Sequence, residues 1–164
     1  MKEILKRIKP KEYGENYKSH ILEMYKLYVE MADRISSRRQ TANSFFLTIN
    51  SAIIGFVGYI KISEINEYNW IIEVAGIFLC YVWYRLVRSY KDLNSGKFKV
   101  IHEIEKELPL SPYDAEWEAI GRGKNPNLYL PFTNLELKTP LIFGLIHLAT
   151  IIISIPWCKL IDMF

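Results

Sequence analysis

The run from Tyr17 to Ile60 constrains the fold more than any other part of the sequence. It contains no proline, and its second half, 42–60, contains no charged residue. A helix needs about 20 residues to cross a hydrocarbon core of roughly 30 Å. The run therefore predicts one helix that begins in water at 17–41 and ends inside a bilayer at 42–60.

Both halves of this helix repeat one spacing, in which steps of four residues alternate with steps of three. Such a set lies on one helical face. In the first half the set is apolar: Tyr17, Ile21, Met24, Tyr28, Met31 and Ile35. In the second half, the small-residue seam consists of Ser44, Thr48, Ser51, Gly55 and Gly58. Small residues let helices approach closely in lipid, so the seam predicts a contact between helices or between subunits.

Two further runs have the length and apolarity of membrane spans, 70–87 and 140–157. Half of the 164 residues are hydrophobic, which is high for a soluble chain of this size. Aromatic residues near the ends of the second run are typical of membrane interfaces. The predicted fold class is all-α, with three transmembrane helices, a cytoplasmic antiparallel helical stalk and a homo-oligomeric ring.

The second span continues without a break signal into an amphipathic helix over 88–108. It leaves the membrane on the side where 17–41 enters, so the two segments are expected to pair as the stalk. The remaining segments are a leader at 1–16, an external loop at 61–69, a cytoplasmic loop with short helices at 109–139 and an external C-terminus at 158–164.

Three polar residues lie on or beside the apolar face of the second stalk helix: Asn94, Lys97 and Glu105. Polar residues in such a face often fix the register of helix pairing. The expected partners of Lys97 are acids on the first arm: Glu23, Glu30 and Asp33. The alternative is that Lys97 and Glu105 extend their charged ends into solvent.

The segment 109–139 carries several turn and cap signals. Ser111 before Pro112 predicts the start of a short helix. Thr133 with Glu136 predicts another, and Thr139 before Pro140 predicts the cap of the third span. Gly121, Arg122, Gly123 and Lys124 form either a small anion-binding nest of backbone N–H groups or a turn.

The distribution of Lys and Arg predicts the orientation. Basic residues flank the cytoplasmic ends of the spans: Arg34, Arg38, Arg39, Arg85, Arg88, Lys91, Lys97, Lys99 and Lys138. The opposite ends have Lys61 and Lys159. This asymmetry places the N-terminus and the stalk in the cytoplasm and the C-terminus outside.

Polar residues inside the spans each need a partner or water. Asn43 and Asn50 lie close to the small-residue seam, where they either hydrogen-bond across helices or line a wet lumen. Glu73 lies near the outer end of the second span. Its carboxylate either reaches the interface between membrane and water or has a functional role inside the membrane. His147 is expected to hydrogen-bond to a neighbouring helix, and the more specific alternative is that it acts as a proton-responsive gate.

No constellation of reactive groups points to an enzyme. The three histidines lie in separate segments, and no catalytic, phosphate-binding or metal-binding motif is present. The two cysteines, Cys80 and Cys158, lie in apolar runs and behave as small apolar groups. The net charge of +3 does not demand a nucleic-acid partner. We therefore expect no catalysis, no cofactor and no metal, with the chain itself, lipids and an unidentified cytoplasmic protein as partners.

Several motifs resemble the RipA-like family of small prokaryotic octameric membrane proteins. The most specific are RRQTAN at 38–43, SYKDLNSGKF at 89–98 and the EW of Glu116 and Trp117, with GRGK and YLPFTNLE further along. The resemblance covers about residues 17–148. It implies a homo-octamer in the bacterial inner membrane and supplies no catalytic activity.

The arrangement is also similar, more generally, to the two-span modules attached to bacterial immune sensors, which are proposed to permeabilise membranes. Two functions follow as hypotheses. The first is a non-enzymatic membrane scaffold with a cytoplasmic interaction region. The alternative is a regulated pore or membrane-permeabilising effector in stress or phage defence.

Overall fold

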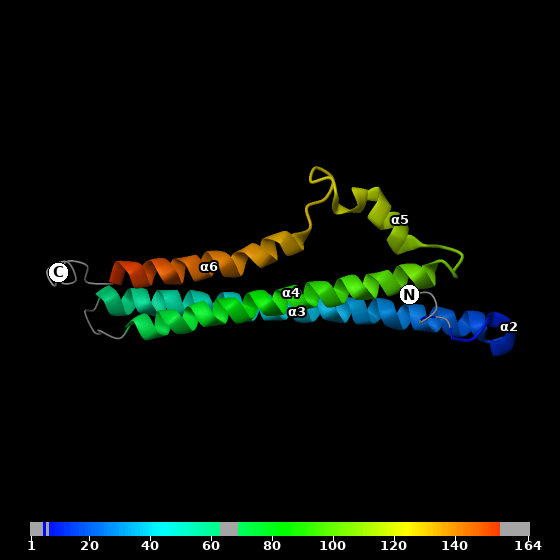
Figure 1. The fold of residues 1–164 in the computed structure, drawn as a ribbon, viewed down its shortest axis with the longest axis horizontal. Helices are drawn as coiled ribbons and strands as arrows, with labels where there is room; N and C mark the ends of the chain where they lie inside the picture. Colours follow the sequence, from blue (N-terminus) through cyan, green and yellow to red (C-terminus); the bar gives the residue numbers. More distant parts are fainter. Residues whose placement is uncertain (1–4, 6, 63–68, 155–164) are drawn as a thin grey trace. The chain divides into compact units, whose positions relative to one another are not determined.

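The computed structural model describes Leu5 and residues 7–62 and 69–154. The regular elements in these ranges are helices, so the expected all-α fold class is confirmed (Figure 1). In chain order they are α2 Pro10–Tyr13, α3 Tyr17–Ile62, α4 Asn69–Glu105, α5 Pro112–Ala119, the 3-10 turn η1 Gly121–Gly123 and α6 Phe132–Ser154. Most of the expected loop at 61–69, and all of 158–164 with Cys158, lie outside the described residues.

Three of these helices, α3, α4 and α6, are long and apolar enough to cross a membrane. The chain divides into two compact units, and α3 and α4 each contribute one part to both. Unit 1 consists of residues 1–38 and 90–131, and unit 2 of residues 39–89 and 132–164. Unit 2 contains the charge-free part of α3, the apolar part of α4 and the whole of α6.

Each helix of unit 2 buries one narrow stripe. On α4 the buried positions are Glu73, Gly76, Cys80, Trp83 and Val87, which alternate steps of three and four. The core is centred on Trp83, whose ring stacks on Phe46 of α3 at 5.9 Å and contacts Phe143 of α6 at 6.0 Å between centroids. The faces outside these stripes are exposed within one chain.

The start of α6 differs from the sequence-based prediction. The predicted separate helix at Thr133 and the cap at Thr139 are wrong, because one continuous helix begins at Phe132 and includes Pro140. The Thr139 hydroxyl donates instead to the Leu135 carbonyl at 3.0 Å, one turn earlier. This extra length places Glu136 on the same helical face as Pro140 and His147, and all three are buried.

In unit 1 the buried face of α3 overlaps the predicted apolar set only in part. Ala32 and Ile35 are buried, and Tyr25 is half-buried. Met24 and Met31, which the spacing places in the apolar set of the first half, are 53% and 39% exposed. The predicted apolar set is therefore only partly buried, although the Met31 sulfur still lies 3.9 Å from the Lys97 ammonium of α4.

Candidate functional site

The most deeply buried polar group in unit 2 is a cluster of four side chains from three helices. His147 of α6 lies with its Nδ1 atom 2.5 Å from Oε2 of Glu73 on α4 and its Nε2 atom 3.2 Å from Oδ1 of Asn50 on α3. The Cys80 thiol donates to the same Asn50 oxygen at 3.2 Å. His147 and Asn50 have no exposed surface, and Glu73 is 1% exposed. We call these residues the His147 cluster.

The Asn50 amide has only one orientation that satisfies its neighbours. Its Nδ2 group donates to the Phe46 carbonyl at 2.8 Å. A flipped amide would put its oxygen against that carbonyl oxygen, and two acceptors do not bond. Asn50 Oδ1 therefore faces Cys80 and His147 as an acceptor, so the Nε2 atom of His147 carries a hydrogen.

Two glycines allow the helices to approach at this cluster. A Cβ atom at Gly76 would lie 2.5 Å from the Cε1 atom of the His147 ring, so the imidazole occupies the space a side chain would need. On α6, a Cβ at Gly144 would lie 3.7 Å from the Cβ of Cys80. The imidazole thus packs directly against the backbone of α4, which sequence spacing alone does not reveal.

A second polar cluster joins the RRQTAN motif to the start of α6. Asn43 donates its Nδ2 group to Glu136 Oε1 at 2.7 Å, and its Oδ1 accepts the Trp83 indole N–H at 2.8 Å. Arg39 forms an ion pair with Glu136 at 3.4 Å. Glu136 was missed as a site residue by sequence reasoning, which treated it as a helix cap. We call these four residues the Asn43 cluster.

The small-residue seam takes no part in either cluster. Ser44, Thr48, Ser51, Gly55 and Gly58 are all exposed within one chain. A Cβ atom at Gly55 or Gly58 would meet nothing within 4 Å. Asn43 and Asn50 therefore do not face the seam, and their side chains form contacts between helices of the same chain.

The three stalk residues have different environments in unit 1. Glu105 is fully buried, so the solvent-reaching alternative is wrong for it. Its carboxylate accepts the Tyr25 hydroxyl at 3.0 Å and the backbone N–H groups of Tyr113 and Asp114 at 2.9 and 3.2 Å. It thereby caps α5, whereas the Ser111 hydroxyl donates to the Glu105 carbonyl. Burial and the hydrogen bond to Glu105 raise the pKa of Tyr25 to about 12.

Lys97 does not pair with the acids that were expected on the first arm. The Lys97 ammonium lies 5.1 Å from the centroid of the Tyr28 ring and 3.9 Å from the Met31 sulfur. Two of its expected partners pair along their own helix instead: Glu23 with Lys26 and Glu30 with Arg34. The Oδ1 atom of Asn94 is buried and has no hydrogen-bond partner among the described residues.

The GRGK segment is a left-handed turn. Gly121, Arg122 and Gly123 have φ of 68°, 54° and 67°, and the Lys124 N–H donates to the Gly121 carbonyl at 2.9 Å. Arg122 is bound by Glu118 and lies 3.7 Å from Asp114. Its hydrogen bond to Glu118 raises the pKa of the guanidinium. Two acidic side chains thus bind the guanidinium of Arg122, the one arginine of the predicted anion nest. This favours the interpretation of the segment as a turn over an anion-binding nest.

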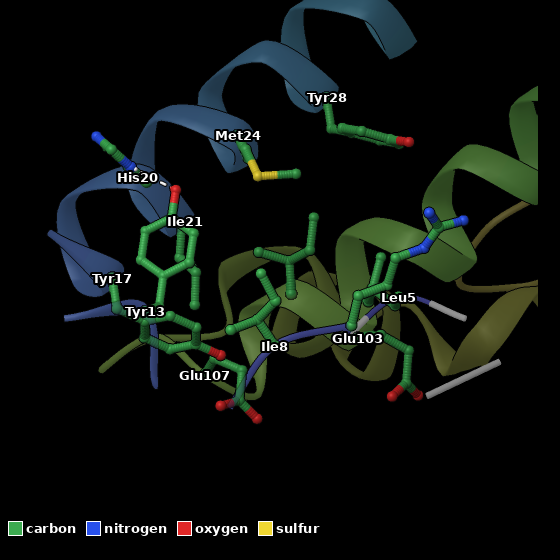
Figure 2. Close-up of a pocket in the computed structure, with 12 residues that line it drawn as sticks. Leu5, Ile8, Tyr13, Tyr17, His20, Ile21, Met24, Tyr28, Glu103 and Glu107 are labelled. Atoms are coloured by element: carbon green, nitrogen blue, oxygen red, sulfur yellow. Dashed lines mark hydrogen bonds between the residues drawn. The ribbon is translucent and has the colours of Figure 1, made fainter. Parts of the chain in front are cut away.

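Unit 1 also contains a cavity of about 290 Å³. Figure 2 shows Met24 and Tyr28 of α3 on one side and Glu103 and Glu107, near the end of α4, on another. Tyr13 borders it and hydrogen-bonds through its hydroxyl to His20 at 2.8 Å. The lining is mostly apolar with a few charged groups, as is usual for ligand pockets.

Among the described residues, no three His, Cys, Asp or Glu side chains lie close enough together to hold a metal ion. The two clusters of unit 2 consist of hydrogen-bond donors and acceptors and one ion pair, and they join α3, α4 and α6 to one another.

A family model described as the octameric membrane protein family matches residues 22–156. The chain belongs to the octameric membrane protein family. The match contains every residue of both polar clusters and of the small-residue seam. It confirms the resemblance drawn from the motifs, and with three long apolar helices it establishes a self-associating membrane protein. Searches among curated proteins and among solved structures each found no match.

Proposed function

We propose that this protein is a non-enzymatic scaffold of the bacterial inner membrane, assembled as a closed ring through the small-residue seam. The observation that carries the proposal is the exposure of the whole seam while the opposite stripe of α3 is buried. Only 22%, 28% and 11% of the most apolar windows of α3, α4 and α6 are buried within one chain. Large surfaces thus remain for lipid and for other subunits.

The seam has the chemistry that helix association in lipid requires. Small side chains let backbones approach, which increases van der Waals contact where the hydrophobic effect is absent. Nothing in the same chain lies within 4 Å of a Cβ at Gly55 or Gly58. A neighbouring subunit is the partner that we assign to this surface, and identical contacts repeated head to tail close into rings.

The positive-inside asymmetry supports a cytoplasmic location for unit 1 and for the N-terminus. In unit 1, α3 exposes Met24, Leu27 and Met31, which are three and four residues apart and share one face. Exposed apolar faces mark protein contacts. We assign this face to recruitment of a cytoplasmic partner, and labelling of a Lys97→Cys variant in right-side-out and inverted vesicles tests the orientation.

Substitution of the seam glycines tests the assembly. Gly55→Leu and Gly58→Leu have room within one chain, so we expect intact helices but a smaller assembly in native mass spectrometry from mild detergent. The matched control is Gly96→Ala, whose Cβ also meets nothing within 4 Å but which lies outside the seam. An unchanged subunit count in both leucine variants would refute the seam as the subunit contact.

The second candidate function is a regulated pore, and the buried Glu73 and His147 are the observation that favours it. Ionisable residues inside spans frequently mark ion or proton paths. Purified protein in liposomes distinguishes the two functions. A scaffold leaves an ion gradient and a trapped dye intact between about pH 5 and about pH 9, the range in which histidine changes charge, whereas a pore releases at least one of them.

A further inference from the structure

The contact between Glu73 and His147 requires a proton. Because Asn50 Oδ1 is an acceptor, the Nε2 atom of His147 already carries one hydrogen. Its Nδ1 atom lies 2.5 Å from Glu73 Oε2. A carboxylate oxygen and an unprotonated ring nitrogen would repel each other at this distance, since neither can donate. One further proton, on the carboxyl or on the ring, makes this contact a hydrogen bond.

With that proton the pair carries no net charge, whichever atom holds it. Removing it leaves a carboxylate, and adding another leaves an imidazolium beside a neutral acid. Either change leaves net charge in a site from which water is excluded, which is costly. The Oε1 atom of Glu73 is buried and has no hydrogen-bond partner among the described residues, so it offers no compensation.

Among the residues that the structure describes, few groups face this pair. From α3 it meets the Asn50 amide, and α4 adds the Cys80 thiol near the same amide oxygen. The other buried charged residue described in unit 2 is Glu136, which pairs with Arg39 and Asn43. The charge of this site therefore depends on one proton shared by two partners.

The same pair holds α6 in place. The imidazole lies in the space left by Gly76, and its two nitrogens contact α4 and α3. We propose that Glu73 and His147 form a single-proton site, and that loss or gain of a proton there loosens the packing of α6 against α3 and α4. The proposal goes beyond the scaffold function and does not depend on it.

Cys80 reports on this packing because α6 covers it at Gly144. In a Cys158→Ser background the full chain, in lipid nanodiscs, is labelled with a small membrane-permeant maleimide from about pH 5 to about pH 9. The rate of Cys80 labelling is divided at each pH by the rate for an exposed cysteine peptide, because the thiolate is the reactive form. We expect this relative rate to be lowest at an intermediate pH and about tenfold higher at both ends, because it follows the fraction of molecules with α6 released.

Glu73→Gln is the decisive variant. Its amide donates a hydrogen to Nδ1 of His147 as the protonated acid does, but it cannot lose that hydrogen. We expect the increase at high pH to disappear and the increase at low pH to remain, since His147 still gains a proton. Comparing both chains at each pH cancels the intrinsic pH dependence of the thiol. A flat profile of the relative rate in the parent chain, or an equal alkaline increase of the relative rate in the variant, overturns the proposal.

A second measurement keeps the test valid if Glu73→Gln does not assemble. In a His20→Gln, His102→Gln chain, His147 is the remaining histidine, and its imidazole nitrogens are observed by ¹⁵N solid-state NMR. We expect a protonated Nε2 and a strongly hydrogen-bonded Nδ1 at neutral pH, with changes in the pH interval that alters Cys80 labelling. A spectrum unchanged from about pH 5 to about pH 9 also overturns the proposal.

Discussion

Each of the two units buries a glutamate of α4, and the two carboxylates have opposite surroundings. In unit 1, Glu105 accepts three hydrogen bonds, two of them from the backbone N–H groups at the start of α5. In unit 2, Glu73 hydrogen-bonds to His147, and among the described residues its second oxygen has no hydrogen-bond partner. Helix N-termini stabilise negative charge, whereas an unpaired buried oxygen disfavours it. Glu105 is thus suited to a fixed structural role and Glu73 to a change of protonation.

We expect the largest difference in stability between the two units from substitution of a glycine by alanine. Gly76→Ala places a methyl group within 2.5 Å of the His147 ring, so the ring must move and its hydrogen bonds lengthen. We expect a loss of about 3 kcal/mol in the free energy of unfolding, from overpacking and unmade hydrogen bonds. Thermal unfolding in detergent, followed by circular dichroism, measures it.

Gly96→Ala is the control, because the same change in α4 meets open space in unit 1. Alanine is the better helix former, so this variant is expected to gain up to about 1 kcal/mol. Equal stability of the two alanine variants would contradict the tight contact at Gly76.

The second effect concerns Glu105. Glu105→Ala leaves the Tyr113 and Asp114 N–H groups without their acceptor, and we expect a loss of about 2 kcal/mol, typical of a lost cap with a buried donor. Glu105→Gln keeps one acceptor oxygen and should lose less. The control is Glu116→Ala, an exposed position in α5. Hydrogen exchange of the amides of residues 112–119 measures the loss locally, and protection equal to the control would exclude the cap.

The sequence predicted the helices well because their spacing is intrinsic to each segment. It also placed Glu105, Glu73 and His147 in the correct helices, since a polar residue in an apolar run is visible without a partner. The sequence did not reveal which side chains contact one another, because these contacts depend on the register between helices that are distant in the chain. Glu105 caps α5 only because the chain turns back after residue 105, and Lys97 meets Tyr28 of the predicted apolar set instead of an acid.

Glu136 illustrates the same limit more sharply. Its place four residues before Pro140 and eleven before His147 puts it on the buried face of α6, but only if the helix passes through the proline. Proline most often begins a helix, and that rule separated Glu136 from the span. The face shared with His147 was the available signal.

The third effect tests whether the Asn43 cluster is structural. Asn43→Ala removes a donor from Glu136 and an acceptor from the Trp83 indole. We expect a loss of about 1.5 kcal/mol in the free energy of unfolding, because Arg39 still partly compensates the carboxylate. Gln40→Ala, an exposed neighbour in the same motif, is the control. A loss confined to oligomer size, with an unchanged melting temperature, would assign Asn43 to subunit contacts instead.

The smallest expected effect is a loss of stability at high pH that arises in unit 1 from Tyr25 and that the His147 cluster should not share. The pKa of Tyr25 is raised from 10.0 to about 12, first by burial and then by its hydrogen bond to Glu105. The folded state therefore favours the neutral phenol. Its contribution to stability is complete below the unfolded pKa near 10.0 and is lost as the pH rises through about 12. Tyr25→Phe has no such titration, so its stability should fall less than that of the parent chain over this interval. Because the other tyrosines and lysines titrate in both chains, the difference between their melting temperatures isolates Tyr25, and parallel curves would mean that the phenol does not contribute in this way.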